Sequence, residues 1–412
     1  MSRVLLFLLL TIFLPIHVYS QKQARSDSLQ SLTKVRPKDI FEVLSKTFKR
    51  KITIDTLEVK SYENHDSSKA TVFSLLPYIN YSLATRWAFG GMVSSYYYLD
   101  KKYGTNLSTT DVLAVYTFRE QLIIKAKSTI WPKANKYNFV GDWRFMKYPS
   151  FTFGLGPNSN FKDRILVNYN YIRIYQNVFK ELFKSFYAGL GYKLDYHYNV
   201  KQLTKGFVSD FERYYVGNQN TTIASGPTIN LLYDSRGNLM NPLGDRFYGY
   251  LSYRYNSSLL GSNNDWQSLT FDARKYIKLP FRSTNVLAFW SYNWLTFGGN
   301  PAYFDLPSTG WDANDNQGRG YIQGRFRSSN LISFETEYRF SITRNKVLGG
   351  VIFGNVQSVS NIQTMNFNTA YPAVGSGIRL KINKFTNTNL SIDFAVGVKG
   401  SKSIFFNLGE TF

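Results

Sequence analysis

The chain has 412 residues and a formal net charge of +22, with 3 His, no Cys and 18% charged residues. Without Cys it has no disulfide framework, no thiolate nucleophile and no Cys-based zinc or iron–sulfur site. So few His residues also make most hydrolase and metal-site chemistries poor candidates. Aromatic residues make up 17% of the chain, too many for a disordered protein. We expect a folded protein that uses its Tyr and Phe outside a compact helical core.

Residues 1–20 are typical of a secretory signal peptide. Arg3 precedes a largely apolar run from Val4 to Leu14, and the small residue Ser20 ends the segment. The run is too short to span a bilayer, which favours a cleaved export signal over a membrane anchor. We expect the mature chain to cross at least one membrane.

Residues 21–70 lie ahead of the first expected strand and form a short N-terminal segment. Within it, residues 39–48 place apolar side chains on one helical face, and basic residues follow. Such a helix either plugs a barrel or contacts a partner, or it rests on the lower rim of a barrel. We favour the rim.

Beyond residue 70 the chain alternates apolar and polar residues with a period of two. The pattern is clear where an apolar set alternates with a polar one: Phe334, Thr336, Tyr338 and Phe340 against Glu335, Glu337, Arg339 and Ser341. A soluble sheet with one wet face and a membrane barrel with a wet lumen both produce this alternation. The segments are longer than most soluble strands, aromatic residues gather near their ends, and short turns alternate with long loops. These three features favour the barrel.

The expected long polar loops cover residues 148–162, 200–220, 298–325 and 360–371. Short turns are expected near residues 131–136, 179–181, 279–280, 343–346 and 384–387. This asymmetry is typical of extracellular loops and periplasmic turns. The sequence therefore predicts an all-β fold over residues 71–412, a 16-stranded antiparallel transmembrane β-barrel, with strands near 71–83, 87–98, 110–118, 121–131, 136–147, 163–177, 183–199, 221–233, 244–258, 266–278, 281–296, 326–341, 346–358, 372–383, 387–398 and 403–412.

Three motifs carry more information than the alternation does. They are Gly318-Arg319-Gly320-Tyr321 with Gly324-Arg325-Phe326 in the longest loop; Gly226-Pro227-Thr228 to Tyr233-Asp234-Ser235-Arg236, followed by Asn241-Pro242-Leu243-Gly244, at a short turn; and Gly375-Ser376-Gly377-Ile378-Arg379 through Asp393 to Leu408-Gly409-Glu410-Thr411-Phe412. By their order and strand placement, residues 71–412 resemble the BamA and TamA superfamily of outer-membrane assembly and translocation barrels, the bacterial surface antigen family.

The resemblance implies that the sixth extracellular loop folds back into the lumen. Its tip would be Arg319, which pairs with acidic residues of the inner wall. One wall acid is Glu337, which the alternation also directs inward. A guanidinium suits this contact because it makes paired hydrogen bonds to carboxylates and stays protonated. Gly318 and Gly320 permit a tight turn beside it, ahead of Tyr321.

The chain departs from the family pattern in two places. Where the family has an Asp-x-Gly on the thirteenth strand, this chain has Asn355-Val356-Gln357, so one wall anion is missing and Asp393 is the alternative partner. The fifty or so residues of the N-terminal segment are also too few for the periplasmic POTRA repeats of the family. The resemblance then implies that separate periplasmic proteins or lipoproteins receive the substrate.

The resemblance also implies a seam between the first and last strands, formed by about Val72 to Leu83 and Ser403 to Phe412. Gly409 would weaken pairing near its end, and an open edge can template another strand. The alternative is a permanently closed seam. Phe406, Leu408 and Phe412, expected on one face, resemble the signal that directs barrel insertion.

We expect a non-enzymatic protein of the Gram-negative outer membrane that assembles or translocates outer-membrane proteins or lipids, without cofactor or metal. The alternative is a passive porin or channel, favoured if the 298–325 loop lies outside the lumen. A third hypothesis, an outer-membrane enzyme, has only His197 in a suitable place and no nucleophile motif beside it. The excess positive charge suits lipopolysaccharide or other outer-membrane lipids and not nucleic acid; the sequence leaves the oligomeric state open.

Overall fold

The protein is described from a computed structural model, which describes residues 38–40, 42–43, 72–100, 105–206, 208–214, 220–236, 241–279, 285–383 and 387–412. The expected signal peptide and most of the 21–70 segment lie outside these residues. Within that segment, the backbone N–H of Lys38 donates to the carbonyl of Asn345 in a short turn of the barrel, at 3.2 Å. No helix among the described residues is long and apolar enough to cross a membrane.

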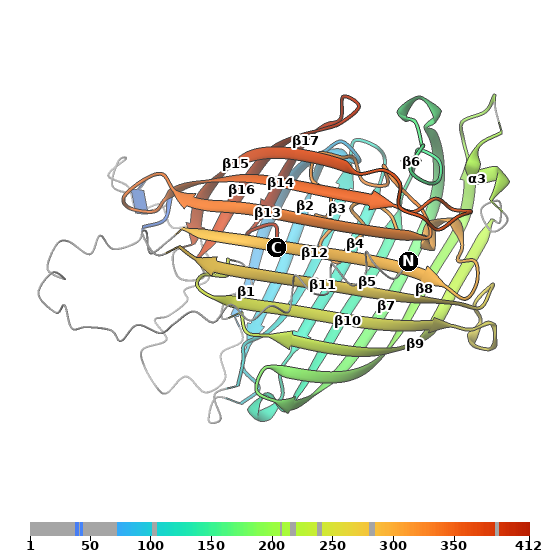
Figure 1. Ribbon diagram of the computed structural model, residues 1–412. Coiled ribbons are helices and arrows are strands. Elements are labelled where there is room, and N and C mark those ends of the chain that lie inside the picture. The colour runs from blue at the N-terminus through green and yellow to red at the C-terminus, as the bar shows by residue number, and fades with distance from the viewer. Residues whose placement is uncertain are drawn as a thin grey trace, which may run out of the picture. The chain divides into compact units, whose positions relative to one another are not determined.

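Strands dominate the described part of the chain and form one antiparallel sheet (Figure 1). Each long strand pairs with the next along the chain, while the three-residue β6 lies beside β7, so that β5 pairs directly with β7. The strands are β1 Val72–Ser82, β2 Arg86–Tyr97, β3 Ser108–Thr117, β4 Leu122–Ile130, β5 Tyr137–Lys147, β6 Ser150–Thr152, β7 Ile165–Phe183, β8 Phe186–Gln202, β9 Thr221–Asp234, β10 Arg246–Asn256, β11 Trp266–Lys278, β12 Val286–Phe297, β13 Asn330–Ser341, β14 Leu348–Val359, β15 Tyr371–Asn383, β16 Thr388–Gly397 and β17 Lys402–Leu408.

The prediction of an all-β, 16-stranded antiparallel barrel is confirmed, with β6 as a short addition in a loop. Most boundaries fall within three residues of the expected ones, and β11 coincides with its predicted range 266–278. The short helices are η1 Lys133–Asn135, η2 Phe161–Asp163, α3 Asp210–Arg213, η3 Ser258–Leu260 and η4 Tyr303–Asp305.

The barrel is polar inside and apolar outside, as the alternation predicted. On β15, Val374 and Ile378 are 59% and 55% exposed, whereas Arg379 and Lys381 are buried. A soluble sheet would bury the aliphatic side chains and expose the charges. The reverse arrangement is that of a barrel whose outer surface meets lipid.

Two expectations about strand ends are wrong. The turn expected at residues 179–181 lies inside β7, which continues to Phe183, and the hairpin closes at Lys184 and Ser185, where Ser185 has φ +66°. Apolar residues at 178, 179, 182 and 183 carry the strand past the polar pair that suggested a turn. The last strand ends at Leu408 and not at Phe412.

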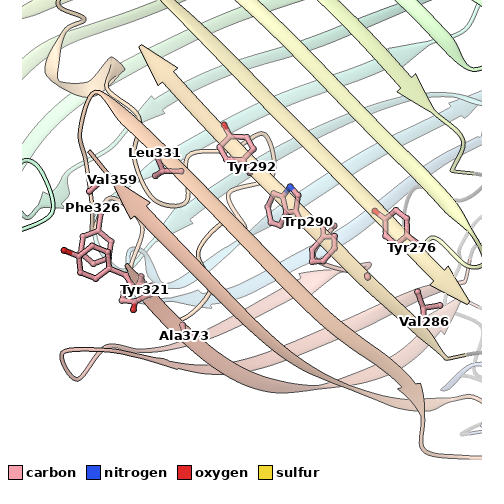
Figure 2. Packing of buried hydrophobic residues seen from close by; sticks show 12 residues of the cluster. Tyr276, Val286, Trp290, Tyr292, Tyr321, Phe326, Leu331, Val359 and Ala373 are labelled. Carbon is pink, nitrogen blue, oxygen red and sulfur yellow. The ribbon is translucent and has the colours of Figure 1, made fainter. Parts of the chain in front are cut away.

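The largest cluster of buried hydrophobic residues joins the wall to a loop inside the barrel. Figure 2 shows Tyr276, Trp290 and Tyr292 on β11 and β12, and Tyr321 and Phe326 of the β12–β13 loop near Val359 and Ala373 of β14 and β15. The rings of Phe326 and Tyr371 stack at 3.9 Å. These contacts fix the loop on which the candidate site is built.

Candidate functional site: the lumen loop and the seam

The loop between β12 and β13, residues 298–329, lies inside the barrel and is called the lumen loop below. Its backbone folds on itself: Thr309 donates to the carbonyl of Phe326 at 3.0 Å, and Gly324 donates to that of Thr309 at 2.8 Å. Leu306 and Arg319 are fully buried. The loop that the sequence placed before the twelfth long strand is therefore folded into the lumen.

Arg319 stands at the centre of a charged cluster. Its Nη1 donates to Oδ2 of Asp393 at 2.7 Å, its Nε donates to Oε1 of Glu335 at 3.0 Å, and its Nη2 donates to Glu335 and Glu337. The guanidinium also lies 3.6 Å from the centroid of the Phe353 ring. One planar cation thus binds carboxylates from β13 and β16, which an ammonium group could not span.

Two more arginines balance the surplus of negative charge. Arg339 pairs with Glu337, and Arg379 pairs with Asp393 and with Glu410, whose Oε2 lies 2.6 Å from its Nε. The guanidinium of Arg319 is buried, which by itself would lower its pKa, but Glu335 and Glu337 raise that pKa above the ordinary value. A buried cluster of charges of this kind fixes the position of the loop tip more than it adds stability.

The glycines beside Arg319 adopt conformations that other residues rarely adopt. Gly318 has φ +78° and Gly320 has φ +105°. A Cβ at position 320 would lie 2.6 Å from Cβ of Ala373. The backbone N–H of Gly320 donates to Oγ of Ser403 at 2.9 Å, so this turn brings the loop tip against β17.

Tyr321 attaches the tip to the long-loop end of the wall. Its hydroxyl donates to the carbonyl of Pro372 at 2.7 Å and accepts from the backbone N–H of Val398 at 3.1 Å. The structure therefore brings together Gly318, Arg319, Gly320, Tyr321, Glu337 and Asp393, the residues that the resemblance grouped.

Asn355 lies at the position where the family pattern has an acid. Its side chain contacts the backbone of the lumen loop. Its Nδ2 donates to the carbonyl of Arg319 at 2.7 Å. Two residues on, Oε1 of Gln357 accepts from Oγ1 of Thr309 at 2.9 Å and from Nε2 of Gln317 at 3.2 Å. Neutral amides on β14 thus hold the loop, Asn355 through the loop's backbone and Gln357 through two of the loop's side chains, while the anions come from β13 and β16.

The sequence analysis missed Glu335 as a partner of Arg319. Glu335 belongs to the same polar face as Glu337, two residues away, so the alternation contained the signal. Both side chains are buried.

The sequence analysis also missed a second attachment of the lumen loop, a few residues before Arg319, to a different part of the wall. Arg144 of β5 donates through Nη2 to the carbonyl of Ala313 at 2.9 Å and through Nη1 to Asp315 at 3.2 Å. Lys125 of β4 pairs with Asp315 as well. Burial would raise the pKa of Asp315, but Lys125 and Arg144 lower it to about 2. No motif signalled this contact, because the pairing residues are almost two hundred positions apart.

Long loops contact the lumen loop at the end of the barrel that carries α3 and β6 (Figure 1). Arg325 donates to Oγ of Ser159 at 2.9 Å, and the hydroxyl of Tyr214 donates to the carbonyl of Pro301 at 3.0 Å. His197, the candidate of the enzyme hypothesis, is buried below them, with its ring stacked 4.4 Å from that of Tyr171. Aromatic rings surround it, and its Nδ1 lies 3.4 Å from Oγ1 of Thr222 and 3.8 Å from Oδ1 of Asp305. Among the described residues no His, Asp and Glu cluster is suited to hold a metal ion.

The residues after β17 turn into the barrel, which corrects the expectation that Phe412 shares a face with Phe406 and Leu408. Gly409 has φ +92°. The ring of Phe412 lies 5.1 Å from that of Trp290, and its carbonyl accepts from Nη2 of Arg339 at 2.8 Å. Phe412 is thus buried in the lumen, whereas Leu408 is 37% exposed on the outer face.

The motif at the short turn after β9 forms a local cluster. Asp234 accepts from Nε and Nη2 of Arg236 at 3.0 and 2.8 Å. Arg236 also lies over the ring of Tyr248, at 4.0 Å. Residues 237–240 are outside the described residues.

The second part of this motif lies at the same end of the barrel. Asn241 and Pro242 are buried, and Nδ2 of Asn241 lies 3.4 Å from the carbonyl of Asn387 in the β15–β16 turn. Gly244 has φ +87°. The structure places this motif at the short-turn end, away from the Arg319 cluster.

The first and last strands lie side by side without a shared ladder of hydrogen bonds. Within the described residues, β1 pairs along its length with β2, and β17 pairs with β16. A cavity of about 150 Å³ lies behind this seam, lined by Asn80 of β1, Phe405 of β17 and Asn316 of the lumen loop, among others. The barrel is therefore nearly closed, with its weakest junction at the predicted place.

Comparison with known proteins agrees with this architecture. No family model and no curated protein sequence matches the chain. Solved structures do: BamA from Haemophilus ducreyi lacking POTRA domains 1-3 has a TM-score of 0.55 and 13% identity, over 82% of this chain and 70% of that chain. CdiB from Acinetobacter baumannii has a TM-score of 0.53 and 11% identity, over 83% and 65%. CdiB from Escherichia coli has a TM-score of 0.54 and 8% identity, over 82% and 62%.

The chain spans less than two thirds of the two CdiB chains. At such low identity the likeness shows the fold, which is the 16-stranded barrel of BamA and CdiB.

Proposed function

We propose that this chain is a non-enzymatic outer-membrane protein of the BamA and TamA type that helps insert or translocate outer-membrane proteins or lipids. The observation that carries the proposal is the Arg319 cluster. It holds a long loop inside the lumen, against β13 and β16, while the described residues of β1 and β17 share no hydrogen-bonded ladder. A wall that is braced from within can part at one seam without collapsing.

A seam without a ladder of hydrogen bonds offers the free strand edge that insertion of another strand requires. The edge of a strand presents unpaired backbone groups, and an incoming strand can satisfy them. β17 is also short, at seven residues, and is followed by Gly409, which has a positive φ. Few hydrogen bonds would have to break for a client strand to enter here.

The alternative, a passive porin or channel, is less well supported. It requires an open lumen, yet the lumen loop is attached to β4 and β5 on one side and to β13 and β16 on the other. A charged loop that is attached to several parts of the inner wall leaves little room for a water-filled path.

We further propose that separate periplasmic proteins or lipoproteins deliver clients to the barrel. To test this, we would isolate the tagged mature protein from its native outer membrane in mild detergent and identify co-purifying proteins by mass spectrometry. Stoichiometric periplasmic partners are expected. A bare barrel that conducts ions in a planar bilayer would favour the channel.

The seam itself can be tested with disulfides, because the chain contains no Cys. Asn80→Cys would be combined in turn with Ser403→Cys, Phe405→Cys and Asn407→Cys, whose side chains line the same cavity. Each purified variant would be placed in liposomes. The assay measures the rate at which a labelled outer-membrane barrel, added as the client, reaches its folded, heat-modifiable form. When the Cys pair that forms a disulfide across the seam is oxidised, we expect this rate to fall to that of empty liposomes. Breaking the disulfide with a reducing agent should restore the rate.

Ile79→Cys with Phe89→Cys provides the matched control, since these residues are direct partners in the β1–β2 ladder. Oxidation of this pair leaves the seam free and should not change the rate. If the crosslinked seam variant folds its client as fast as the control, the proposed opening is wrong.

A further inference from the structure

Three arginines from three different connections gather at the long-loop end of β2, β3 and β7. Arg86 begins β2, Arg119 lies in the β3–β4 turn, and Arg164 directly precedes β7. The guanidinium carbons of Arg119 and Arg164 lie 5.0 and 5.7 Å from the centroid of one ring, that of Phe151. Burial, followed by the charges of Arg86 and Arg164, lowers the pKa of Arg119.

None of these arginines forms an ion pair with a described residue, although Glu120 and Asp163 are adjacent in sequence. Arg119 donates through Nη2 to the carbonyl of Leu83 at 3.2 Å, and its buried Nε has no partner. In the Arg319 cluster, by contrast, every guanidinium meets carboxylates. Like charges held together without a counterion repel each other, and an anion that bound there would relieve the repulsion.

The backbone around these arginines is well anchored. Gln121 donates to the carbonyls of Pro149 and Ala84, at 2.9 and 3.4 Å, and so joins the three connections. The backbone positions of the three arginines are therefore fixed relative to one another before a ligand binds, which lowers the entropy cost of binding.

An exposed aromatic surface lies next to the arginines in sequence. Trp87, Phe89 and Phe118 are 42%, 45% and 64% exposed on the outer face of the barrel. Their rings form a row, with centroids 6.3 Å apart between Trp87 and Phe89 and 5.6 Å apart between Phe89 and Phe118. Charged donors at the rim, directly followed by apolar rings on the lipid-facing wall, match the two ends of an acidic lipid.

We propose that Arg86, Arg119 and Arg164 bind the phosphate of a phosphorylated lipid head group, whose acyl chains lie on Trp87, Phe89 and Phe118. Guanidinium groups suit phosphate because they form paired, charge-assisted hydrogen bonds to its oxygens. The site rests on the proposal that the barrel spans an outer membrane, but it does not require that the barrel assemble or translocate anything.

The test measures binding of fluorescent bis-phosphorylated lipid A to the full-length mature protein in detergent micelles. Arg86→Gln, Arg119→Gln and Arg164→Gln would be combined in one variant. We expect its affinity to fall about tenfold or more, since several charge-assisted bonds are lost. Lys201→Gln, Lys205→Gln and Arg213→Gln together form the matched control, because they remove the same charge from exposed positions of β8 and the following loop. The control should bind almost as the unmodified protein does.

Further arms identify the ligand and separate this inference from the membrane proposal. Dephosphorylated lipid A should bind weakly, and inorganic phosphate should not compete; effective competition by phosphate would assign the site to a free anion and overturn the lipid proposal. Equal losses in the triple variant and the control would show unspecific charge attraction. Heat-modifiable migration reports whether each variant has folded. If the protein inserts into bilayers but its triple variant binds normally, only the present inference fails; if it never inserts, the membrane proposal fails.

Discussion

Arg319 is fully buried, and its guanidinium is surrounded by carboxylates of Glu335, Glu337 and Asp393. Removing one partner from such a cluster leaves charges that are out of contact with water and uncompensated, which costs far more than the pair itself contributes. Charge and shape together therefore hold the loop tip in its position. A planar group with several donors fits the three carboxylates, and glycines on either side allow the approach.

Replacing Arg319 should release the loop tip. For Arg319→Ala we expect a loss of about 3–5 kcal/mol in the free energy of unfolding, the usual result of breaking a buried pair. Arg319→Lys should recover part of this, because an ammonium keeps the charge but cannot reach all three carboxylates. Urea unfolding in detergent, together with protease cleavage within residues 298–329, measures both effects.

Arg213→Ala serves as the control for this prediction. Its side chain is 67% exposed and its pairing with Asp210 spans 3.9 Å, so a change below about 1 kcal/mol is expected. Comparable losses in the two variants would mean that the Arg319 cluster does not hold the loop.

At the scale of elements, the last strand shows why the alternation of apolar and polar residues does not by itself fix where a strand ends. Ile404, Phe406 and Leu408 face outward, so a continued strand would place Glu410 on the lipid face. A carboxylate is costly there. The chain instead turns at Gly409, and Glu410 meets Arg379 and Asn389 inside the barrel, at 2.6 and 2.7 Å.

The inward position of Phe412 can be tested by its contact with Trp290. Phe412→Ala should lower the free energy of unfolding by about 3–5 kcal/mol, because the substitution leaves a cavity among buried rings. It should also shift the contribution of Trp290 to the emission of the seven Trp residues, obtained as the difference from a matched Trp290→Phe variant. Leu408→Ala, on the outer face of β17, should change neither quantity by a comparable amount in detergent. An unchanged emission in Phe412→Ala would place the ring outside the lumen.

At the scale of the whole molecule, the lumen is crossed by one loop that contacts distant walls. Arg319 of this loop binds β13 and β16, and Asp315, four residues earlier, binds β4 and β5. Because these strands lie far apart in the sequence, the loop ties early and late parts of the barrel to each other. The same arrangement fills the space through which a porin would conduct.

Shortening the lumen loop should therefore open a conducting path. Replacing residues 303–327 with a short Gly-Ser linker is expected to raise the single-channel conductance in planar bilayers well above that of the unmodified barrel. As the control, a linker would replace residues 258–264 of the β10–β11 loop, where Leu259 is 95% exposed, and conductance should not change. High conductance before any change would contradict a filled lumen.

The sequence by itself determined the barrel, because alternation, segment length and turn spacing are properties of each strand and its immediate surroundings. It also directed Glu337 inward and, by the same face, contained the signal for Glu335. The tertiary structure decided which groups meet across the lumen: Arg144 with Asp315, Asn355 with the carbonyl of Arg319, Phe412 with Trp290. Such contacts join positions far apart in the chain, and no period or spacing encodes them. They form only when closure of the barrel brings opposite walls within reach of one loop.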